Sequence, residues 1–272
     1  MRIALIQMAV TDDKARNIRT AVERIRKQAS AGAQMAVLPE MFCSPYDTSR
    51  FARYGEPPGG EAQTALSSLA AELGIYIVAG SLPELLDGLI YNTSFVYDGQ
   101  GRQVARHRKV HLFDINVDGG QYFRESDVLS AGDTVTAFDT PWGRVALGIC
   151  FDIRFAELAS LMAREGADVF IYPGAFNMTT GPAHWELHFR ARAVDNQVYT
   201  VGVAPARVER ASYVSYGHSI VCDPWGRVLH DSGPGDVDAI VELDMSLVSS
   251  VRRQLPIRGA RVDLGITCAE GS

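Results

Sequence analysis

The chain has 272 residues, of which 47% are hydrophobic and 21% are charged, and its formal net charge is −6. This composition supplies enough apolar residues for a sizeable core and excludes an intrinsically disordered chain. The acidic balance, without a long run of Lys or Arg, argues against nucleic acid or an anionic membrane surface as the main partner. The apolar runs are strand-sized, so no membrane-spanning helix is predicted.

Residues 2–8 (RIALIQM) predict a first strand rather than a secretory leader. The cysteines form no C-x-x-C pair, so zinc binding and dithiol redox chemistry are poorly supported; they are Cys43, Cys150, Cys222 and Cys268. Without an export signal, free thiols in a reducing compartment are expected. The sequence therefore predicts a cytoplasmic protein without a metal site.

The first half of the chain alternates strand-like and helix-like segments. Strands are predicted at residues 2–8, 32–40 and 74–80, helices at 17–31 and 61–73, and a hairpin at 92–106. The helical segments carry apolar residues on one side only, as in Ile18, Val22 and Ile25.

The second half repeats this order. Strands are predicted at residues 144–150, 166–174 and 197–204, helices at 156–165 and 184–196, and a hairpin at 217–230. The two hairpin turns, DGQGR at 98–102 and DPWGR at 223–227, follow the same pattern. The chain is therefore interpreted as an internal repeat.

The alternation of strands and helices predicts an α/β fold. A helix between successive strands implies parallel pairing, whereas the hairpins add antiparallel strands. We expect a four-layer αββα sandwich with two mixed sheets and an internal pseudo-two-fold repeat. The whole chain, 1–272, is expected to form one domain, with 256–272 as a C-terminal tail. Ligands in such folds bind beyond the carboxyl ends of strands, which points to Glu40, Cys150 and the residues after Tyr172.

Three short segments contain candidate catalytic residues, and each has an ordinary structural interpretation. Glu40 follows a predicted strand and could be a capping or solvated carboxylate. Lys109 belongs to a basic cluster, residues 106–114, which could be a solvated loop. Cys150 could be a buried structural cysteine, since cysteine is among the most often buried residues.

Together these residues supply what acyl transfer from an amide requires. A thiol is only partly ionised at neutral pH, so Cys150 needs a base, and Glu40 could take its proton and deliver it to the departing amine. Attack on the carbonyl creates an oxyanion, which Lys109 and the backbone N–H of Phe151 could hold.

The same three segments resemble the nitrilase superfamily of carbon–nitrogen hydrolases. The matching runs are LPEMF at 38–42, RKVHLF at 108–113 and GICFDIRF at 148–155. The resemblance extends from residue 2 to about 263 and implies the αββα sandwich. It further implies a cofactor-free triad in which Glu40 is the base, Lys109 stabilises the oxyanion and Cys150 is the nucleophile.

A second glutamate is typical of the superfamily, and Glu125 stands where it is expected, with Asp127 as a neighbouring alternative. It would position Lys109 and the substrate nitrogen. Its structural interpretation is a surface carboxylate.

Four further segments, at 113–115, 172–185, 193–197 and 211–218, resemble the omega-amidase branch. That branch hydrolyses the terminal amide of α-ketoglutaramate and α-ketosuccinamate to the 2-oxo diacid and ammonia. The resemblance implies a small amide substrate that carries a carboxylate. Phe151, Phe176 and Thr180 would line its pocket, with Tyr46 as a cap.

Arg154 could form a bidentate pair with the substrate carboxylate. The structural alternative for Arg154 is an ion pair with Asp152 or Glu157. His184 is expected to be architectural, and Tyr213 is expected to belong to an interface or the core.

The competing functions are a deaminated-glutathione amidase, another aliphatic or N-carbamoyl amide hydrolase of the same superfamily, a nitrile hydrolase, or a non-catalytic scaffold. The resemblance also implies a homodimer. Omega-amidases end in Pro, basic residues and Asp-Leu-Tyr, whereas residues 256–265 (PIRGARVDLG) lack the tyrosine. A tail contact between subunits is therefore in doubt.

Overall fold

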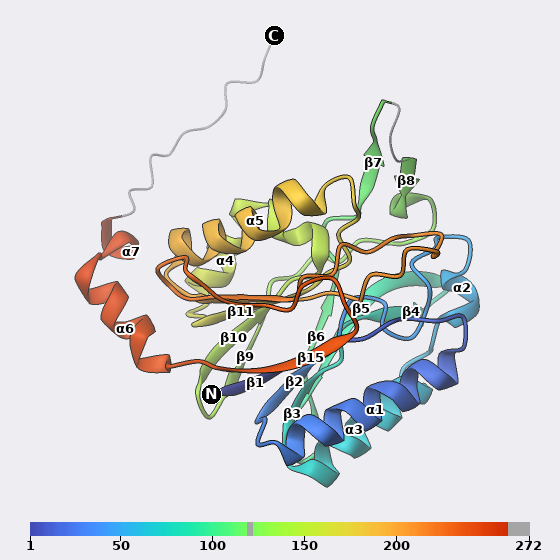
Figure 1. The fold of residues 1–272 in the computed structure, drawn as a ribbon, viewed down its shortest axis with the longest axis horizontal. Helices are drawn as coiled ribbons and strands as arrows, with labels where there is room; N and C mark the ends of the chain where they lie inside the picture. The colour runs from blue at the N-terminus through green and yellow to red at the C-terminus, as the bar shows by residue number, and fades with distance from the viewer. Residues whose placement is uncertain (119–121, 261–272) are drawn as a thin grey trace.

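A computed structural model describes residues 1–118 and 122–260 of the chain. Within these residues the strands form a seven-stranded sheet, a six-stranded sheet and a two-stranded ribbon. Helices flank the two large sheets, each of which contains both parallel and antiparallel pairs (Figure 1). The protein is thus a mixed α/β fold built on two mixed sheets, as predicted.

The seven-stranded sheet has the order β15-β1-β2-β3-β5-β4, with β6 also paired to β5. Its strands are β1 (Arg2–Gln7), β2 (Met35–Val37), β3 (Tyr76–Val78), β4 (Leu82–Leu86), β5 (Leu89–Tyr97), β6 (Gln103–Arg108) and β15 (Val237–Glu242). Strands β1, β2 and β3 are mutually parallel, because a helix connects each to the next. The other pairings are antiparallel.

The six-stranded sheet has the order β14-β13-β12-β11-β10-β9. Its strands are β9 (Thr136–Thr140), β10 (Gly143–Leu147), β11 (Val169–Pro173), β12 (Tyr199–Val203), β13 (Ile220–Cys222) and β14 (Val228–Asp231). The central strands β10, β11 and β12 are parallel, as β1, β2 and β3 are in the first sheet. The ribbon pairs β7 (Asp114–Asn116) with β8 (Tyr122–Arg124).

The four predicted helices are present among the described residues, together with helices that were not predicted. They are α1 (Lys14–Ser30), α2 (Phe51–Tyr54), α3 (Glu61–Leu73), α4 (Ala156–Arg164), α5 (Gly181–Asn196), α6 (Met245–Gln254) and α7 (Ile257–Ala260), with 3-10 turns η1 (Glu125–Asp127) and η2 (Cys150–Arg154). Helix α1 starts three residues earlier than predicted because Asp13 caps it, accepting a hydrogen bond from the Arg16 N–H at 2.9 Å. Helix α5 starts at Gly181, with Pro182 in its first turn.

The two predicted hairpin turns share one hydrogen-bonding scheme. The Asp98 side chain accepts hydrogen bonds from the backbone N–H groups of Gln100 and Arg102. Asp223 accepts the corresponding pair from Trp225 and Arg227. In each turn a short carboxylate replaces backbone partners that a tight loop lacks.

Alternation along the strands separates the core between the two sheets from the cores beneath the helices. In β1, Ile3 and Leu5 lie in the core between the two sheets, whereas Ala4 and Ile6 pack toward α1 and α3. The central strands of the other sheet do the same: Ile171 faces the first sheet and its neighbours in the strand face α4 and α5. Because successive side chains point to opposite faces and both faces are covered, central strands such as β2 and β11 are apolar throughout.

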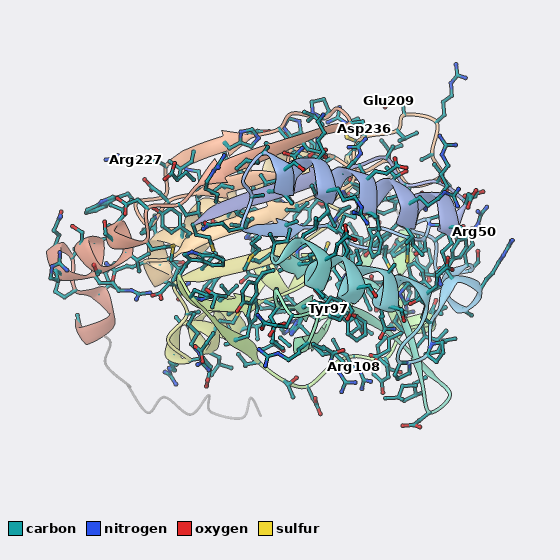
Figure 2. All side chains as sticks on the ribbon, turned by 90° about the horizontal axis from the view of Figure 1, so that it is seen from below. Arg50, Tyr97, Arg108, Glu209, Arg227 and Asp236 are labelled. Atoms are coloured by element: carbon teal, nitrogen blue, oxygen red, sulfur yellow. The ribbon has the colours of Figure 1, made fainter. Side chains whose placement is uncertain are left out.

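The figures show how the helices are distributed. In Figure 1, α4 and α5 lie above the sheets and α1 and α3 lie below them. Figure 2, seen from below, shows α1 and α3 covering their sheet. Across residues 1–118 and 122–260, no helix combines the length and apolar character needed to span a membrane.

The described part of the predicted tail, 256–260, contains α7, which contacts α5. The remainder of the tail, residues 261–272, lies outside the described residues, and the missing tyrosine motif falls largely there. Strands β4, β7, β8, β9 and β15 were not predicted. They are edge or ribbon strands, or short, and their composition gives a weaker strand signal than the buried central strands.

Candidate active site

Glu40 lies just beyond the carboxyl end of β2, and its side chain is fully buried. The next residue, Met41, has a left-handed backbone with φ 51°, so the chain turns sharply after Glu40. One carboxylate oxygen, Oε1, accepts hydrogen bonds from Nζ of Lys109 at 3.0 Å and Nδ2 of Asn92 at 2.8 Å. The other, Oε2, accepts one from the backbone N–H of Ala175 at 2.8 Å. This glutamate is held by donors from both sheets and is not the solvated carboxylate considered above.

Lys109 directly follows β6, and its side chain is also fully buried. Its ammonium group donates to Glu40 at 3.0 Å and lies 2.9 Å from Oε2 of Glu125. Its backbone N–H donates to the carbonyl of Asn92 on β5, which continues the strand ladder one residue beyond β6. The lysine is therefore positioned by a sheet rather than by a mobile loop.

Glu125 begins the 3-10 turn η1, and it is buried rather than on the surface. Its Oε1 accepts a hydrogen bond from the Tyr46 hydroxyl at 2.6 Å, and its Oε2 accepts one from the Phe113 N–H at 2.6 Å. Its contact with Lys109 favours Glu125 over the neighbouring Asp127, whose side chain is largely exposed. Two carboxylates thus flank one lysine.

Cys150 stands at the first position of η2, three residues after the end of β10 rather than within that strand. Its φ of 47° is left-handed, an uncommon conformation that turns its side chain out of the strand direction. Gly148 precedes it and passes the Tyr172 ring so closely that a Cβ would lie 2.4 Å from a ring carbon. The Glu40 carboxylate lies close enough to the Cys150 thiol to raise its pKa. The nucleophile candidate and the base candidate therefore belong to one buried site.

The three groups shift one another's proton affinities. Burial raises the pKa of the Cys150 thiol, the Glu40 carboxylate raises it further, and Lys109 only partly offsets these effects. Burial alone would lower the pKa of Lys109, but Glu125 and Glu40 outweigh it and raise that pKa. Burial and the proximity of Glu40 raise the pKa of Glu125 although Lys109 opposes them. At neutral pH the site holds a neutral thiol and a charged lysine.

The basic cluster at 106–114 is not a solvated loop, because His107 and Lys109 are fully buried. The Asp152 carboxylate hydrogen-bonds to Nε2 of His107 at 3.1 Å and to Nδ1 of His111 at 2.8 Å. It also accepts the Ile149 N–H at 2.9 Å. Burial would raise the pKa of Asp152, but the two histidines hold it well below its usual range. Asp152 thus links the turn that begins with Cys150 to the segment that carries Lys109.

A cavity opens beside Cys150, and four of the five predicted substrate-binding residues line it. Its lining comprises Phe113, Cys150, Phe151, Arg154, Ala175, Phe176, Thr180 and Tyr213. A larger, open hollow shares Ala175 and Tyr213 with this lining and borders Glu40 and Tyr46. The prediction for Tyr46 differs in detail: its hydroxyl contacts Glu125 and Glu40 instead of lining the small cavity.

Arg154 does not form the ion pair that was its structural alternative. The Asp152 carboxylate is occupied by histidines, and no carboxylate of residues 1–118 and 122–260 lies within 4.0 Å of the Arg154 guanidinium. The guanidinium instead contacts His184 and His188, and it lies 4.7 Å from the centre of the Phe176 ring. Burial lowers the pKa of Arg154. A half-buried cation without a counterion favours an anionic ligand at this position.

Three residues that contribute to the site were not predicted from the sequence as site residues. Asn92 binds Glu40 from β5, and the Ala175 N–H binds it from the segment after β11. Tyr213 was expected in an interface or the core, but it lines the cavity, donates a hydrogen bond to the Ala175 carbonyl and lies 4.6 Å from the Tyr46 ring. The signal for Tyr213 was its place in the resembling segment 211–218. Asn92 and Ala175 gave none, because an amide side chain in a strand and a backbone N–H have no distinctive sequence pattern.

The arrangement has the geometry of nucleophilic acyl transfer. A buried carboxylate is near enough to the thiol to raise its pKa, and an ammonium group lies beside that carboxylate where it can stabilise developing negative charge. In the described part of the chain, no group of three or more His, Cys, Asp or Glu side chains is arranged to hold a metal ion.

The sequence of this chain matches a known protein family and known proteins over most of its length. Residues 2–253 match the family model described as carbon-nitrogen hydrolase. The chain is 48% identical to omega-amidase NIT2 of Xenopus tropicalis over 260 residues, which cover 96% of this chain and 94% of the relative. It is 48% identical to omega-amidase NIT2 of Homo sapiens over 264 residues, covering 97% and 96%.

Solved structures show the same likeness. The crystal structure of Saccharomyces cerevisiae Nit3, described as a member of branch 10 of the nitrilase superfamily, matches with a TM-score of 0.87 and 41% identity. The match covers 94% of each chain. The fold is therefore shared with this structure over nearly the whole length.

Proposed function

Because this chain belongs to the carbon-nitrogen hydrolase family, within the nitrilase superfamily, we propose that it is an omega-amidase. It would cleave the terminal amide of short amides that carry a carboxylate, with α-ketoglutaramate and α-ketosuccinamate as substrates. The products would be ammonia and the 2-oxo diacid.

In the first half-reaction Glu40 takes the thiol proton as the Cys150 sulfur attacks the amide carbon. Lys109 and the Phe151 N–H stabilise the oxyanion, a contribution of about 2.7–4 kcal/mol for one such donor. The tetrahedral intermediate collapses as Glu40 returns the proton to nitrogen, so that ammonia leaves and a thioester forms on Cys150. The influence of the Glu40 carboxylate on the pKa of the thiol and its hydrogen bond with Lys109 support these roles.

In the second half-reaction water replaces the amine. Glu40 removes a proton from water, the hydroxide adds to the thioester carbon, and the acid leaves as the thiol is restored. Glu125 acts as a positioning residue that fixes the Lys109 ammonium together with Glu40. No step calls for a metal or an organic cofactor.

The single observation that carries the substrate class is Arg154. It lines the same cavity as Cys150 and has no carboxylate partner among the described residues. A guanidinium in that position fits a carboxylate at the far end of a short amide. Phe151, Phe176 and Thr180 would pack along the chain between the two groups, and Tyr46 would close the site near Glu125.

The proposal is tested by measuring ammonia release from α-ketoglutaramate and from succinamate. We expect turnover of both, and no turnover of either, with hydrolysis of another amide, would remove the substrate claim. The remaining candidate is deaminated-glutathione amidase. The ratio of kcat/KM for deaminated glutathione and for α-ketoglutaramate separates the two functions, because this ratio reports differential binding of the transition states.

We also infer an αββα sandwich with a pseudo-two-fold repeat, formed as one domain. The parallel triplets β1-β2-β3 and β10-β11-β12 and the two equivalent turns support the repeat. The core region between the sheets supports a single domain. Limited proteolysis that released two stable halves would contradict it.

A cytoplasmic homodimer is the form we propose for the protein in the cell. Exposed apolar side chains on α4 and α5 support self-association; they are Leu161, Leu187 and Val194. Free thiols at Cys43, Cys150 and Cys222 support a reducing compartment. Sedimentation velocity and cell fractionation test the two parts separately.

A further inference from the structure

Two histidines on α5 hold one corner of the Arg154 guanidinium. Nη1 of Arg154 donates to Nδ1 of His184 at 3.1 Å and to Nε2 of His188 at 3.2 Å. Because arginine has only donors, both of these ring nitrogens must be unprotonated acceptors. The two histidines are four residues apart, so they lie on the same side of α5, one turn from each other. Together they use both hydrogens of Nη1.

The opposite edge of the guanidinium is left unsatisfied. Nε of Arg154 is buried without a hydrogen-bond partner in the part of the chain that the structure describes, and Nη2 has none there either. The Nε–Nη2 edge offers two parallel N–H groups, the geometry that matches both oxygens of a carboxylate. The histidines therefore bind Nη1 and leave the Nε–Nη2 edge available to the carboxylate.

Aromatic rings restrict the guanidinium further. Its central carbon lies 4.7 Å from the Phe176 ring centre and 5.5 Å from the Phe151 ring centre. Burial and the Arg154 cation lower the pKa of His188 to about 4. His188 is therefore a neutral acceptor at neutral pH and does not repel the arginine.

We propose that His184 and His188 are positioning residues that orient Arg154 toward the substrate carboxylate, and so set the preference for carboxylate-bearing over neutral amides. This inference rests on the proposed omega-amidase function. Its physical basis is preorganisation: a guanidinium that is already fixed loses little rotational freedom when the carboxylate binds. Neither histidine touches the reacting amide in this assignment.

The test compares succinamate with succinamide, its neutral isostere, in purified full-length protein. In His184→Leu/His188→Leu, both acceptors are lost while the side-chain volume is roughly kept. We expect KM for succinamate to rise roughly 10- to 100-fold, as for loss of hydrogen bonds to a charged group. The kcat for succinamate, and both kcat and KM for succinamide, should stay within about threefold of wild type.

Rescue and control variants separate positioning from general structural damage. His184→Asn/His188→Gln places amide oxygens near the positions of Nδ1 and Nε2, and it should restore most of the preference for succinamate. His230→Leu, a partly buried histidine that contacts Ser232 outside the site, should leave the preference unchanged.

Each outcome decides the inference. A selective rise in KM for succinamate that the amide variant reverses supports it. An unchanged preference in the leucine variant, or equal losses with both substrates, overturns it while the proposed function stands. A wild-type protein that does not distinguish succinamate from succinamide overturns both.

Discussion

The Asp152 carboxylate hydrogen-bonds to Nε2 of His107 at 3.1 Å, and both side chains are fully buried. Asp152 stands two residues after Cys150, and His107 stands two residues before Lys109. One contact thus connects the turn that begins with Cys150, after β10, to the end of β6, which Lys109 follows, although β10 and β6 belong to different sheets. The distance between nucleophile and oxyanion stabiliser depends on this buried carboxylate.

Asp152→Asn is expected to lower both activity and stability. An amide offers one acceptor oxygen, so the N–H groups of His111 and Ile149 and the His107 ring lose part of their hydrogen bonding. Leaving a buried donor unsatisfied costs about 1–3 kcal/mol. Urea unfolding should show that loss, and kcat should fall more than KM changes.

The loss of stability in Asp152→Asn is expected to depend on pH. The pKa of Asp152 is lowered on folding, so the ionised carboxylate stabilises the protein above its unfolded pKa of about 4. That contribution is lost as the pH falls below this value. The difference in the free energy of unfolding between wild type and Asp152→Asn should therefore shrink between about pH 5 and pH 3. A difference that grows on acidification would contradict this account.

Lys109→Met is expected to lower kcat by roughly 10²–10³, because one oxyanion donor is removed. It should also destabilise the protein by about 3–5 kcal/mol, since Glu40 and Glu125 lose their buried partner. Lys14→Met, which removes a partly exposed lysine paired with Glu56, is the matched control and should keep kcat. Equal kcat in the two variants would exclude Lys109 from the reaction.

Arg154→Lys is expected to raise KM for succinamate by roughly 10- to 100-fold. A lysine keeps the positive charge but cannot form two parallel hydrogen bonds with a carboxylate. The steady-state kinetics of succinamide are the internal control, and they should change little. A similar loss with both substrates would mean that Arg154 supports the fold of the site rather than the substrate.

The high pKa of the Cys150 thiol predicts a slow reaction with iodoacetamide at neutral pH. Alkylation requires the thiolate, whose population rises as the pH approaches the pKa. Burial and the Glu40 carboxylate raise that pKa, so the alkylation rate of Cys150 should still be increasing at pH 9. Peptide mass spectrometry distinguishes it from Cys43 and Cys222. A rate that levels off below pH 8 would show an ionised thiol in the resting site.

The sequence was sufficient to predict the strands, helices and turns that are determined by residues close together in the chain. Continuous apolar strands, one-sided helices and the two DxxGR turns are all visible as patterns, and so is the carboxyl-end position of Glu40. The contact of Asn92 with Glu40 depends on the strand order within the seven-stranded sheet, and that of the Ala175 N–H depends on how the two sheets pack, so neither was predictable. The role of Asp152 was missed for the same reason, since its histidine partners are about 40 residues away in the chain.

The most direct test of the account is to quench the protein with acid during turnover of succinamate and to analyse its peptides by mass spectrometry. We predict an acyl adduct on Cys150 with the mass of the substrate less ammonia, present in wild type and absent in Cys150→Ala. That variant should also lose turnover while its thermal midpoint stays close to wild type, and Cys43→Ala should keep both adduct and turnover. A wild-type protein that releases ammonia while Cys150 stays unlabelled, or that carries the label on another residue, would contradict the mechanism.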